Sequence, residues 1–363
     1  MSWLLAFAGF AALIILHELG HFAAAKAVGM RVERFSLFFG RTPLRFQRGE
    51  TEYGIGWLPL GGFVKITGMN PQEDIPPEVL PRAYFRQPVW KRLVVIAAGP
   101  AVNIVLAFLI LMGLYWAAIG DPRKAEATDR IEQVTPGTPA AAVLRQGDRI
   151  LTVDGRGGDP AALRRQIASH RCAGKTKRNG CRAARPAVLE IQRGQERRTV
   201  RATPVYSAAD KRALLGFQFA IKRPPPVGPV TAAGLSVDRM WFFTRGTVET
   251  IAQIFKPEKR KEISGVVGSY EATRQSIQLG VEQGVYLLAV ISLSLGVINL
   301  FPFLPLDGGH IFWALAEKVR GRAVPFSVME RAGFVGFALV LALFFIGFTN
   351  DIGRLTGDGF GVR

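Results

Sequence analysis

Four long apolar blocks divide this chain of 363 residues, and each is close to the length that a helix needs to cross a membrane. The hydrocarbon core of a bilayer is about 30 Å thick, which a helix of about 20 apolar residues spans. The second block contains no charged side chain at all. We therefore predict a polytopic α-helical membrane protein with four transmembrane helices, over residues 1–29, 93–120, 283–310 and 332–350.

The composition favours a membrane protein over a disordered or an ordinary soluble one. Charged residues make up 20% of the chain, yet its mean hydropathy is +0.20, so charged and apolar residues must lie in separate segments. The formal net charge of +18 suits an anionic surface, and we expect anionic membrane lipids and no nucleic acid as partners. Two cysteines are too few for a disulfide-rich scaffold.

The first block has one feature of a cleaved signal peptide, because the small residues in Ala23–Ala27 resemble a cleavage site. Its start, however, lacks the basic residues that are typical of a signal peptide. Cleavage would also remove the motif described below. We therefore expect the block to remain in the protein as a helix.

The segments between the blocks predict smaller structured parts. Residues 30–92 include Tyr53–Lys65, whose glycines and aromatic residues predict a membrane-associated β-hairpin or a half-inserted loop. Residues 121–223 alternate as short strands around a helix at Pro139–Arg145, which predicts one soluble α/β domain. A stiff triple-proline linker and an interfacial helix at Val237–Phe255 are expected within residues 224–282. We expect residues 311–331 to form a segment on the cytoplasmic side and residues 351–363 to form a C-terminal tail.

An H-E-x-x-H motif lies within the first apolar block, at His17, Glu18 and His21. Its spacing places both imidazoles on one face of a helix, where they can bind one Zn²⁺, with Glu18 beside them as a general base. The alternative is a chance match among buried polar groups. Ionisable residues cost roughly 2.5–3.5 kcal/mol each inside a membrane, so a cluster of three favours function over chance.

A catalytic zinc site needs a third protein ligand, and Asp307 is the candidate. It is the single acidic residue within residues 283–316, at the end of the third block. The first and third of four alternating spans run in the same direction. His17 lies about 24 Å into the first span at a rise of 1.5 Å per residue, so all three candidate ligands share one depth. Pro302 and Pro305 break the helix before Asp307 and turn its carboxylate inward.

These two motifs together resemble the site-2 protease family of intramembrane zinc metalloproteases. H-E-L-G-H lies in the first span, and N-x-x-P-x-x-P-x-D-G-G begins at Asn299 in the third. Gly61–Lys65 is similar to a membrane loop of the family, Ala98–Asn103 matches the start of its second span, and Ile131–Gly155 resembles a PDZ domain. One such domain is typical of the shorter bacterial members related to regulator-of-sigma-E proteases. Ser264–Gly268 departs from the family, in which many members have Gly-Pro.

The resemblance implies an enzyme that cuts transmembrane helices of other membrane proteins, such as an anti-sigma factor or signal-peptide remnants. One Zn²⁺ per chain would be held by His17, His21 and Asp307. Glu18 would take a proton from the attacking water and return it to the leaving amine. Asn299 would stabilise the oxyanion, unless it only makes a helix–helix hydrogen bond. The expected substrate-binding residues are Gly61, Gly62, Phe63, Lys65, Pro302 and Pro305.

A helical substrate must unwind before its carbonyl groups can be attacked, because they are hydrogen-bonded within the helix. The Tyr53–Lys65 segment would hold the unwound chain as an added strand, or it would only pack at the interface. The PDZ-like domain would bind a C-terminal peptide exposed by an earlier cut, or would obstruct large ectodomains. The sequence leaves both pairs of alternatives open.

Basic residues in short loops predict how the protein is oriented in the membrane. Lys26–Arg92 contains eleven Lys and Arg residues, and further basic residues precede the fourth span. We therefore expect a multi-pass protein of the inner or plasma membrane. Its zinc site should face the cytoplasm, and its PDZ-like domain should lie outside.

Cys172 and Cys181 are the only cysteines, and they are the candidates for a disulfide. Disulfides persist outside the cytoplasm, where the predicted orientation places both residues. The segment between them is rich in Gly, Lys and Asn and has no large apolar side chain to fold around. A bond that closes this loop would add about 2–3 kcal/mol of stability. The alternative is two free thiols in a flexible insertion.

Two other classes of protein remain as alternatives. A catalytically silent, PDZ-bearing membrane scaffold would have lost a zinc ligand or the base, whereas this chain has all of them. A transporter would have paired charges at mid-membrane and internal repeats, which the sequence does not show. The chemistry of the motifs therefore favours a zinc metalloprotease.

Overall fold

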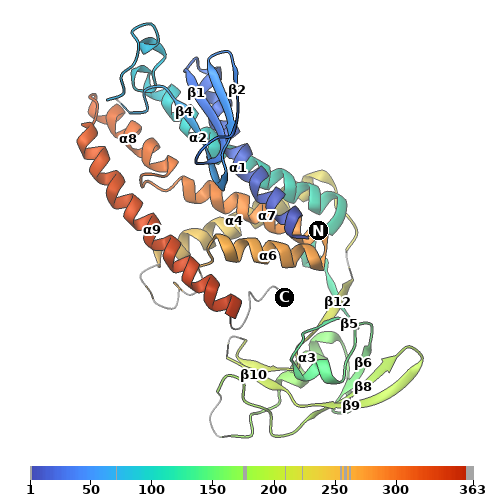
Figure 1. Ribbon diagram of the computed structural model, residues 1–363. Coiled ribbons are helices and arrows are strands. Elements are labelled where there is room, and N and C mark those ends of the chain that lie inside the picture. Colours follow the sequence, from blue (N-terminus) through green and yellow to red (C-terminus); the bar gives the residue numbers. More distant parts are fainter. Residues whose placement is uncertain are drawn as a thin grey trace. The chain divides into compact units, whose positions relative to one another are not determined.

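The computed structural model divides into two compact units (Figure 1). Unit 1 comprises Met1–Ala118 and Val227–Arg363, and unit 2 comprises Ile119–Pro226. The description covers all residues except 1, 71, 175–177, 209, 223, 254–255, 257–259, 261–262 and 357–363. A sheet-containing unit is therefore inserted into a helical one, as predicted.

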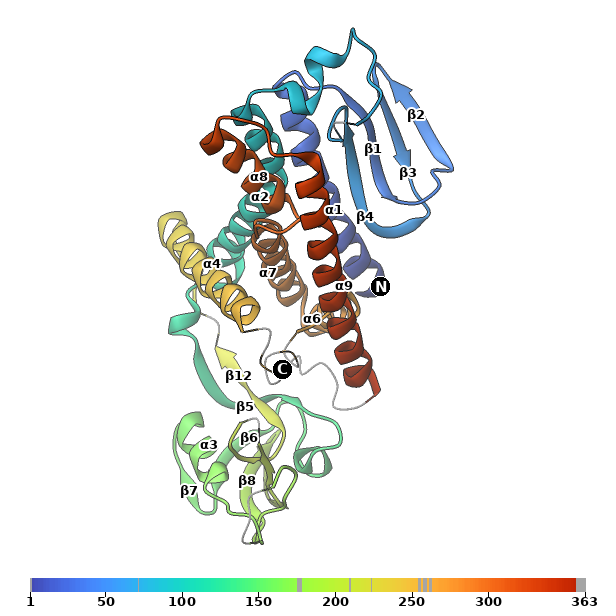
Figure 2. The same ribbon diagram turned by 90° about the vertical axis from the view of Figure 1, so that its left-hand side faces the viewer.

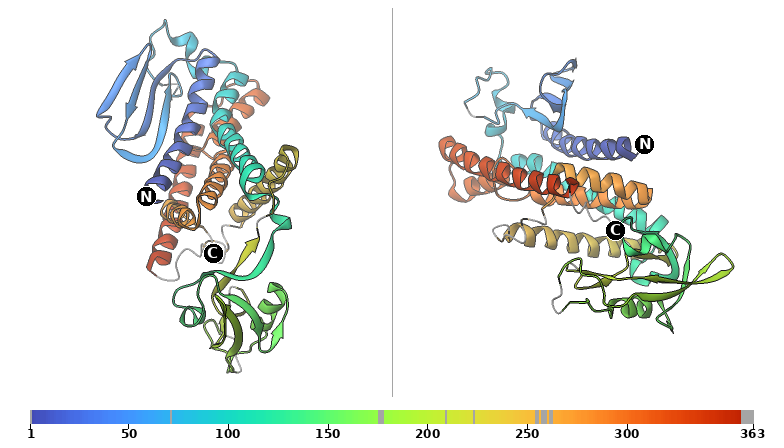
Figure 3. Two further views of the ribbon diagram at one scale, coloured as in Figure 1. Left: turned by 90° about the vertical axis from the view of Figure 1, so that its right-hand side faces the viewer. Right: turned by 60° about the horizontal axis from the view of Figure 1, so that its bottom comes forward.

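Unit 1 contains four helices that are long and apolar enough to span a membrane. They are α1 (Ser2–Ala27), α2 (Val89–Leu114), α7 (Val281–Asn299) and α9 (Phe326–Thr356). A π-helical turn, η3 (Tyr115–Ile119), continues α2. Helices α1, α2 and α7 lie side by side (Figures 2 and 3).

The third predicted span differs most from the structure. Helix α7 ends at Asn299 instead of residue 310, and residues 300–306 are not helical. Asp307 therefore does not close the third span; it begins α8 (Asp307–Arg320), whose last turn is basic. The prolines at positions 302 and 305 explain the break, because proline lacks the N–H that a helix interior needs.

Large apolar side chains of the long helices remain exposed, which explains the positive mean hydropathy. On α9, Phe334, Val335 and Phe337 are exposed by 70%, 73% and 56%. Trp116 and Leu109 on the second span are also exposed. Extended apolar surface of this kind marks contact with lipid or a partner. The lipid bilayer of a multi-pass membrane protein covers such a surface.

Two amphipathic helices connect the inserted unit to the third span. Helix α4 (Pro229–Ala252) includes most of the predicted interfacial helix, whose end at Phe255 lies outside the described residues. Helix α6 (Val266–Leu279) begins in the segment that departs from the family pattern. The buried Asp351 of α9 accepts hydrogen bonds from Gly265 N at 3.1 Å and Gly268 N at 2.7 Å. The α9 carboxylate thus satisfies free N–H groups at the start of α6.

A four-stranded sheet follows α1 in unit 1 and lies against that helix (Figure 2). The strand order is β2-β3-β1-β4. Strands β1 and β3 pair in parallel, whereas β1–β4 and β2–β3 are antiparallel. The strands are β1 (Val32–Phe39), β2 (Leu44–Arg48), β3 (Thr51–Ile55) and β4 (Leu58–Ile66).

The predicted hairpin over Tyr53–Lys65 is wrong in its pairing. The segment does form two strands, β3 and β4, but β1 lies between them. Gly56 N donates to Leu37 O at 2.7 Å, so the connection crosses the end of β1 instead of folding β4 back onto β3. Alternating side chains identify a strand but not its partner. Strand β4 consequently forms one edge of the sheet.

Unit 2 is built around one antiparallel sheet with its own apolar core. The strand order is β12-β5-β6-β8-β9, and the short β7 pairs with β6. The predicted helix at Pro139–Arg145 is only the 3-10 turn η5 (Pro139–Ala142), because its C-cap residue Val143 leaves the helical conformation. The elements are β5 (Glu126–Val134), β6 (Arg149–Val153), β7 (Arg156–Gly157), α3 (Pro160–Ala168), β8 (Ala187–Arg193), β9 (Glu196–Ala202), β10 (Val205–Ser207), β11 (Arg212–Leu214) and β12 (Phe217–Lys222).

Candidate metal centre

Three side chains from two distant segments of unit 1 meet at one point. His17 and His21 lie one turn apart on α1 and are buried, and Asp307 lies in the first turn of α8. The Nε2 atoms of the two histidines are 3.3 Å apart. Each Nε2 also lies 3.3 Å from Asp307 Oδ2. The structure therefore brings the three predicted ligands together.

This equal-sided triangle has the size of a tetrahedral zinc site. Ligand atoms about 2.0–2.1 Å from a tetrahedral Zn²⁺ lie about 3.3–3.4 Å from one another. Two imidazole nitrogens and one carboxylate oxygen are also a donor set that zinc prefers in catalytic sites. Among the described residues, no conventional hydrogen bond satisfies Asp307 Oδ2. The residues present fit a zinc ion in both geometry and chemistry.

Helix α2 holds the ring of His21. Its Nδ1 donates a hydrogen bond to Val95 O at 2.9 Å. In a neutral imidazole, a proton on Nδ1 leaves Nε2 with the lone pair that a metal needs. The Nε2 atom is the one that faces Asp307. The Nδ1 atom of His17 has no hydrogen-bond partner within the described part of the chain.

A cavity of about 450 Å³ borders the three ligands. Glu18 is partly buried in its wall. Strand β4 forms another part of the wall, where a Cβ built on Gly62 would lie 3.0 Å from Glu18 Cγ and 3.1 Å from Ser36 O. The glycine therefore allows the strand to approach the glutamate closely. The other predicted site residues in the wall are Gly61, Phe63, Asn299 and Pro305.

Two predicted substrate-binding residues lie outside this cavity. The Lys65 ammonium group pairs with Glu33 at 2.6 Å and with Glu73 at 2.9 Å. These two carboxylates raise the pKa of Lys65. Pro302 borders a second, apolar cavity of about 740 Å³ between α2, α4 and α7. Neither side chain faces the metal ligands directly.

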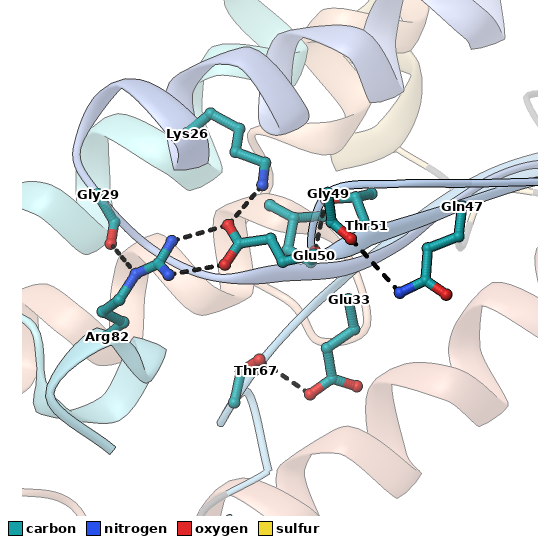
Figure 4. A network of polar contacts seen from close by, with 10 residues as sticks. Lys26, Gly29, Glu33, Gln47, Gly49, Glu50, Thr51, Thr67 and Arg82 are labelled. Atoms are coloured by element: carbon teal, nitrogen blue, oxygen red, sulfur yellow. Dashed lines mark hydrogen bonds and ion pairs between the residues drawn. The ribbon is translucent and has the colours of Figure 1, made fainter. Parts of the chain in front are cut away.

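A polar network fixes the sheet to the end of α1 (Figure 4). Glu50, in the turn between β2 and β3, accepts two hydrogen bonds from Arg82, at 2.7 and 2.8 Å, and one from Lys26 at 2.6 Å. Arg82 Nε also donates to Gly29 O at 3.2 Å. The hydrogen bonds from Arg82 lower the pKa of Glu50 to about 2, with Lys26 adding to the effect. The network therefore ties the start of β3 to the helix that carries both histidines.

Two residues of the site were not predicted from the sequence. Val95 supplies a backbone carbonyl, which no side-chain pattern reveals. Gly99 faces the ring of His21, and its only signal is the motif Ala98-Gly99-Pro100 at the start of the second span. Both depend on the packing of α1 against α2.

In unit 2, the structure joins Cys172 and Cys181 in a disulfide, with their Cα atoms 5.8 Å apart. This separation lies in the ordinary range for a disulfide. The oxidation state in the cell stays a prediction.

A family model described as peptidase family M50 matches residues 5–343. A protein of Nostoc sp. named "Putative zinc metalloprotease all3971" is 31% identical, over 94% of this chain and 93% of its own length. A Clostridium perfringens protein named "Putative zinc metalloprotease CPE1693" is 28% identical, over 97% of this chain and 98% of its own length. A Mycolicibacterium smegmatis protein named "Zinc metalloprotease Rip1" is 31% identical, over 89% of this chain and 87% of its own length.

Proposed function

Because this chain belongs to peptidase family M50, we propose that it cleaves transmembrane segments of other membrane proteins. It is a zinc metalloprotease with zinc as its cofactor. The observation that carries the proposal is the position of His17 and His21, on a helix long and apolar enough to span a membrane. A peptide bond that reaches these residues would belong to a chain that is itself in the membrane.

The chemistry needs a base, a site for the oxyanion and a bound substrate. Zinc, held by His17, His21 and Asp307, would supply a Lewis acid that polarises the scissile carbonyl and acidifies the attacking water. Glu18 takes the water proton and returns it to the leaving amine. Its carboxylate is in the wall of the cavity that borders the ligands, which supports this role.

Asn299 donates a hydrogen bond from its carboxamide to the developing oxyanion in this proposal. It is the last residue of α7 and lines the same cavity as Glu18. Asparagine keeps its donor at every pH, so the interaction would not depend on protonation. The alternative role, a helix–helix hydrogen bond, predicts no effect on the rate of the chemical step.

An extended substrate would pair with the edge of β4. This strand is an outer strand of its sheet, and Gly61, Gly62 and Phe63 lie at the cavity. Backbone pairing would keep the substrate unwound and would leave its side chains free to vary. Pro305 would contact the substrate within the cavity, and Lys65 and Pro302 would act from outside it.

We further propose that unit 2 is a PDZ-like domain on the outer side of the membrane and that the metal centre faces the cytoplasm. The excess of basic residues in Lys26–Arg92 supports this orientation. Strand β12 is an outer strand of the unit 2 sheet, which suits the addition of a C-terminal peptide. The anionic lipids of the same membrane would be a further partner.

The proposal is tested by comparing membrane-protein fragments from cells that produce the wild type, Glu18→Gln or Glu78→Gln. Glu78 is exposed and serves as the matched control. Mass spectrometry of new N-termini should find cuts within transmembrane segments in the wild type and the control, and none in Glu18→Gln. Cuts confined to soluble loops would contradict intramembrane cleavage. Identical fragments in all three would favour the silent scaffold.

A further inference from the structure

Helices α1 and α2 pack against each other beside the metal centre. The two helices run antiparallel, because Lys91 Nζ at the start of α2 donates to Val28 O, just after α1, at 2.9 Å. They also approach closely: a Cβ built on Gly20 would lie 2.7 Å from Ala98 O. Side chains on the facing side of α2 therefore decide how much room the α1 histidines have.

Gly99 is the position on α2 that faces the ring of His21. A Cβ built on Gly99 would overlap Nε2 and would lie 2.6 Å from Cε1 and 2.8 Å from Cδ2. Real Cβ atoms essentially never come within 3.0 Å of such atoms. The ring cannot simply swing aside, because its Nδ1 is held by Val95 O, one turn earlier on the same face.

We propose that Gly99 is a positioning residue of the metal centre. The carbonyl of Val95 fixes one nitrogen of His21, and the missing side chain of Gly99 leaves space for the other. Together they allow one orientation of the ring, in which Nε2 faces Asp307 and His17. The inference rests on the proposed metal centre, to which it adds a residue that binds no metal itself.

The same helix offers a matched control. Gly113 also lies within α2, and a Cβ built on it meets nothing within 4 Å. Replacing either glycine by alanine favours the helix to the same degree. Only Gly99→Ala should weaken metal binding. Loss of an outer-shell partner typically lowers metal affinity 10–100-fold.

The experiment uses the full chain purified in detergent and loaded with Zn²⁺ or Co²⁺. Gly99→Ala should bind zinc at least tenfold more weakly and change the visible spectrum of bound Co²⁺, whereas Gly113→Ala should match the wild type. Wild-type affinity and spectrum in Gly99→Ala would overturn the inference. If His21→Ala also retained wild-type metal binding, the metal centre itself would fail instead.

A double substitution separates positioning from general packing. Removing the ring of His21 removes the atoms that the new methyl group would meet. In the metal-free protein, adding Gly99→Ala to His21→Ala should therefore not lower the unfolding temperature, even if Gly99→Ala alone does. An equal loss of stability in both backgrounds would show that Gly99 serves helix packing only.

Unit 2 carries a basic lobe, which is made of residues 171–173, 178–185, 204–207 and 211–214. Backbone hydrogen bonds hold these segments side by side: Ala173 N donates to Arg182 O at 3.1 Å, and Ala183 N donates to Pro204 O at 2.8 Å. The Cys172–Cys181 disulfide closes the first two segments into a loop. Backbone hydrogen bonds and one disulfide therefore hold the segments of the lobe together.

The basic side chains of the lobe are exposed, and two of them share a face of the paired strands. Arg182 lies opposite Val205, which lies opposite Leu214, so Arg212, two residues from Leu214, points to the same side as Arg182. The six basic residues form no ion pair with the part of the chain that the structure describes. They are Arg171, Arg178, Arg182, Arg185, Lys211 and Arg212.

We infer that the basic lobe binds the anionic phospholipid headgroups of the membrane that holds the helices. Both ends of unit 2 continue into unit 1, at residues 118–119 and 226–227. Unit 2 is therefore tethered twice to the part of the chain that carries the membrane helices. Arginine matches phosphate with two parallel hydrogen bonds. Exposed side chains between the arginines are small, such as Ala184, which suits contact at the headgroups without insertion.

The full chain in nanodiscs tests this inference. Amide hydrogen exchange in the lobe should slow at least threefold when phosphatidylglycerol is added to phosphatidylcholine, and 0.5 M NaCl should reverse the effect. Arg→Gln at positions 171, 178, 182 and 185 should abolish it. The same change at four other exposed arginines of unit 2 should not. These control positions are Arg130, Arg156, Arg197 and Arg201.

Two results would overturn the lipid assignment. The first is equal exchange of the lobe in neutral and anionic nanodiscs. The second is protection by soluble poly-L-glutamate without any protection by phosphatidylglycerol, which would identify an acidic polypeptide as the partner instead. Neither result bears on the metal centre, because no residue of the lobe belongs to unit 1.

Discussion

The Glu50 network gives a prediction whose size follows from the structure. The substitution that tests it is Glu50→Gln, which keeps the shape of the side chain and removes its charge. The neighbouring cations, Arg82 first and then Lys26, lower the pKa of Glu50 from 4.5 to about 2. A pKa lowered by this amount corresponds to about 3 kcal/mol before screening. Because Glu50 is 30% and Arg82 44% exposed, we expect about 1 kcal/mol after screening by solvent.

The pH dependence of this contribution has a definite sign. The folded protein holds Glu50 ionised more firmly than the unfolded chain does, so the stabilisation is complete above about pH 4.5. It is lost as the pH falls towards 2. The loss should be present in the wild type and absent in Glu50→Gln.

Hydrogen exchange in β2 and β3 is the assay, with rates corrected for the intrinsic effect of pH. Glu50→Gln should speed exchange of these strands about fivefold, the equivalent of about 1 kcal/mol. The exposed Glu78→Gln should leave it unchanged. Equal exchange in the two variants would refute the reasoning, as would an acceleration spread evenly over the whole chain.

Gly62→Ala crowds Glu18 and the β1 backbone and should lower cleavage about tenfold at unchanged zinc content. An unchanged rate would contradict the close approach of β4. Arg92→Met leaves Glu317 without its two hydrogen bonds of 2.9 and 2.5 Å and should lower the free energy of unfolding by about 3 kcal/mol. The unfolding temperature should fall, and adding Glu317→Leu should partly restore it. No restoration would contradict the pairing. Cys172 and Cys181 should react with an alkylating reagent in intact cells only after reduction. Free thiols without reductant would contradict the bond, and thiols that only a membrane-permeant reagent reaches would contradict its outside location.

The sequence predicted the membrane helices because a bilayer imposes a fixed length on apolar segments. It placed His17 and His21 on one face for an equally local reason, the 3.6-residue turn of a helix. Asp307 was identified as a candidate ligand by its chemistry, but it was assigned to the third span, whereas it begins α8. Residues 300–306 are apolar and continue the hydropathy of the span, whereas the chain has already left the helix at Asn299.

The pairing of strands and the packing of helices that are far apart in the sequence were not predictable. The strand pattern in Tyr53–Lys65 was evident, but nothing local indicates that β1 lies between β3 and β4. Gly99 is likewise an ordinary helix glycine until the register of α1 against α2 places an imidazole on it. Both features depend on tertiary contacts, which hydrophobic periodicity does not determine.

The proposed mechanism has one zinc ion, held by His17, His21 and Asp307, that works with Glu18 to cut peptide bonds in the membrane. Its most direct test measures zinc content and cleavage of a transmembrane substrate on the same purified samples. Glu18→Gln should retain about one zinc per chain and lose at least 100-fold in rate, within the range of general-base removal. Asp307→Ala should lose the zinc and the activity together. Wild-type cleavage by Glu18→Gln, or full zinc in active Asp307→Ala, would contradict the account.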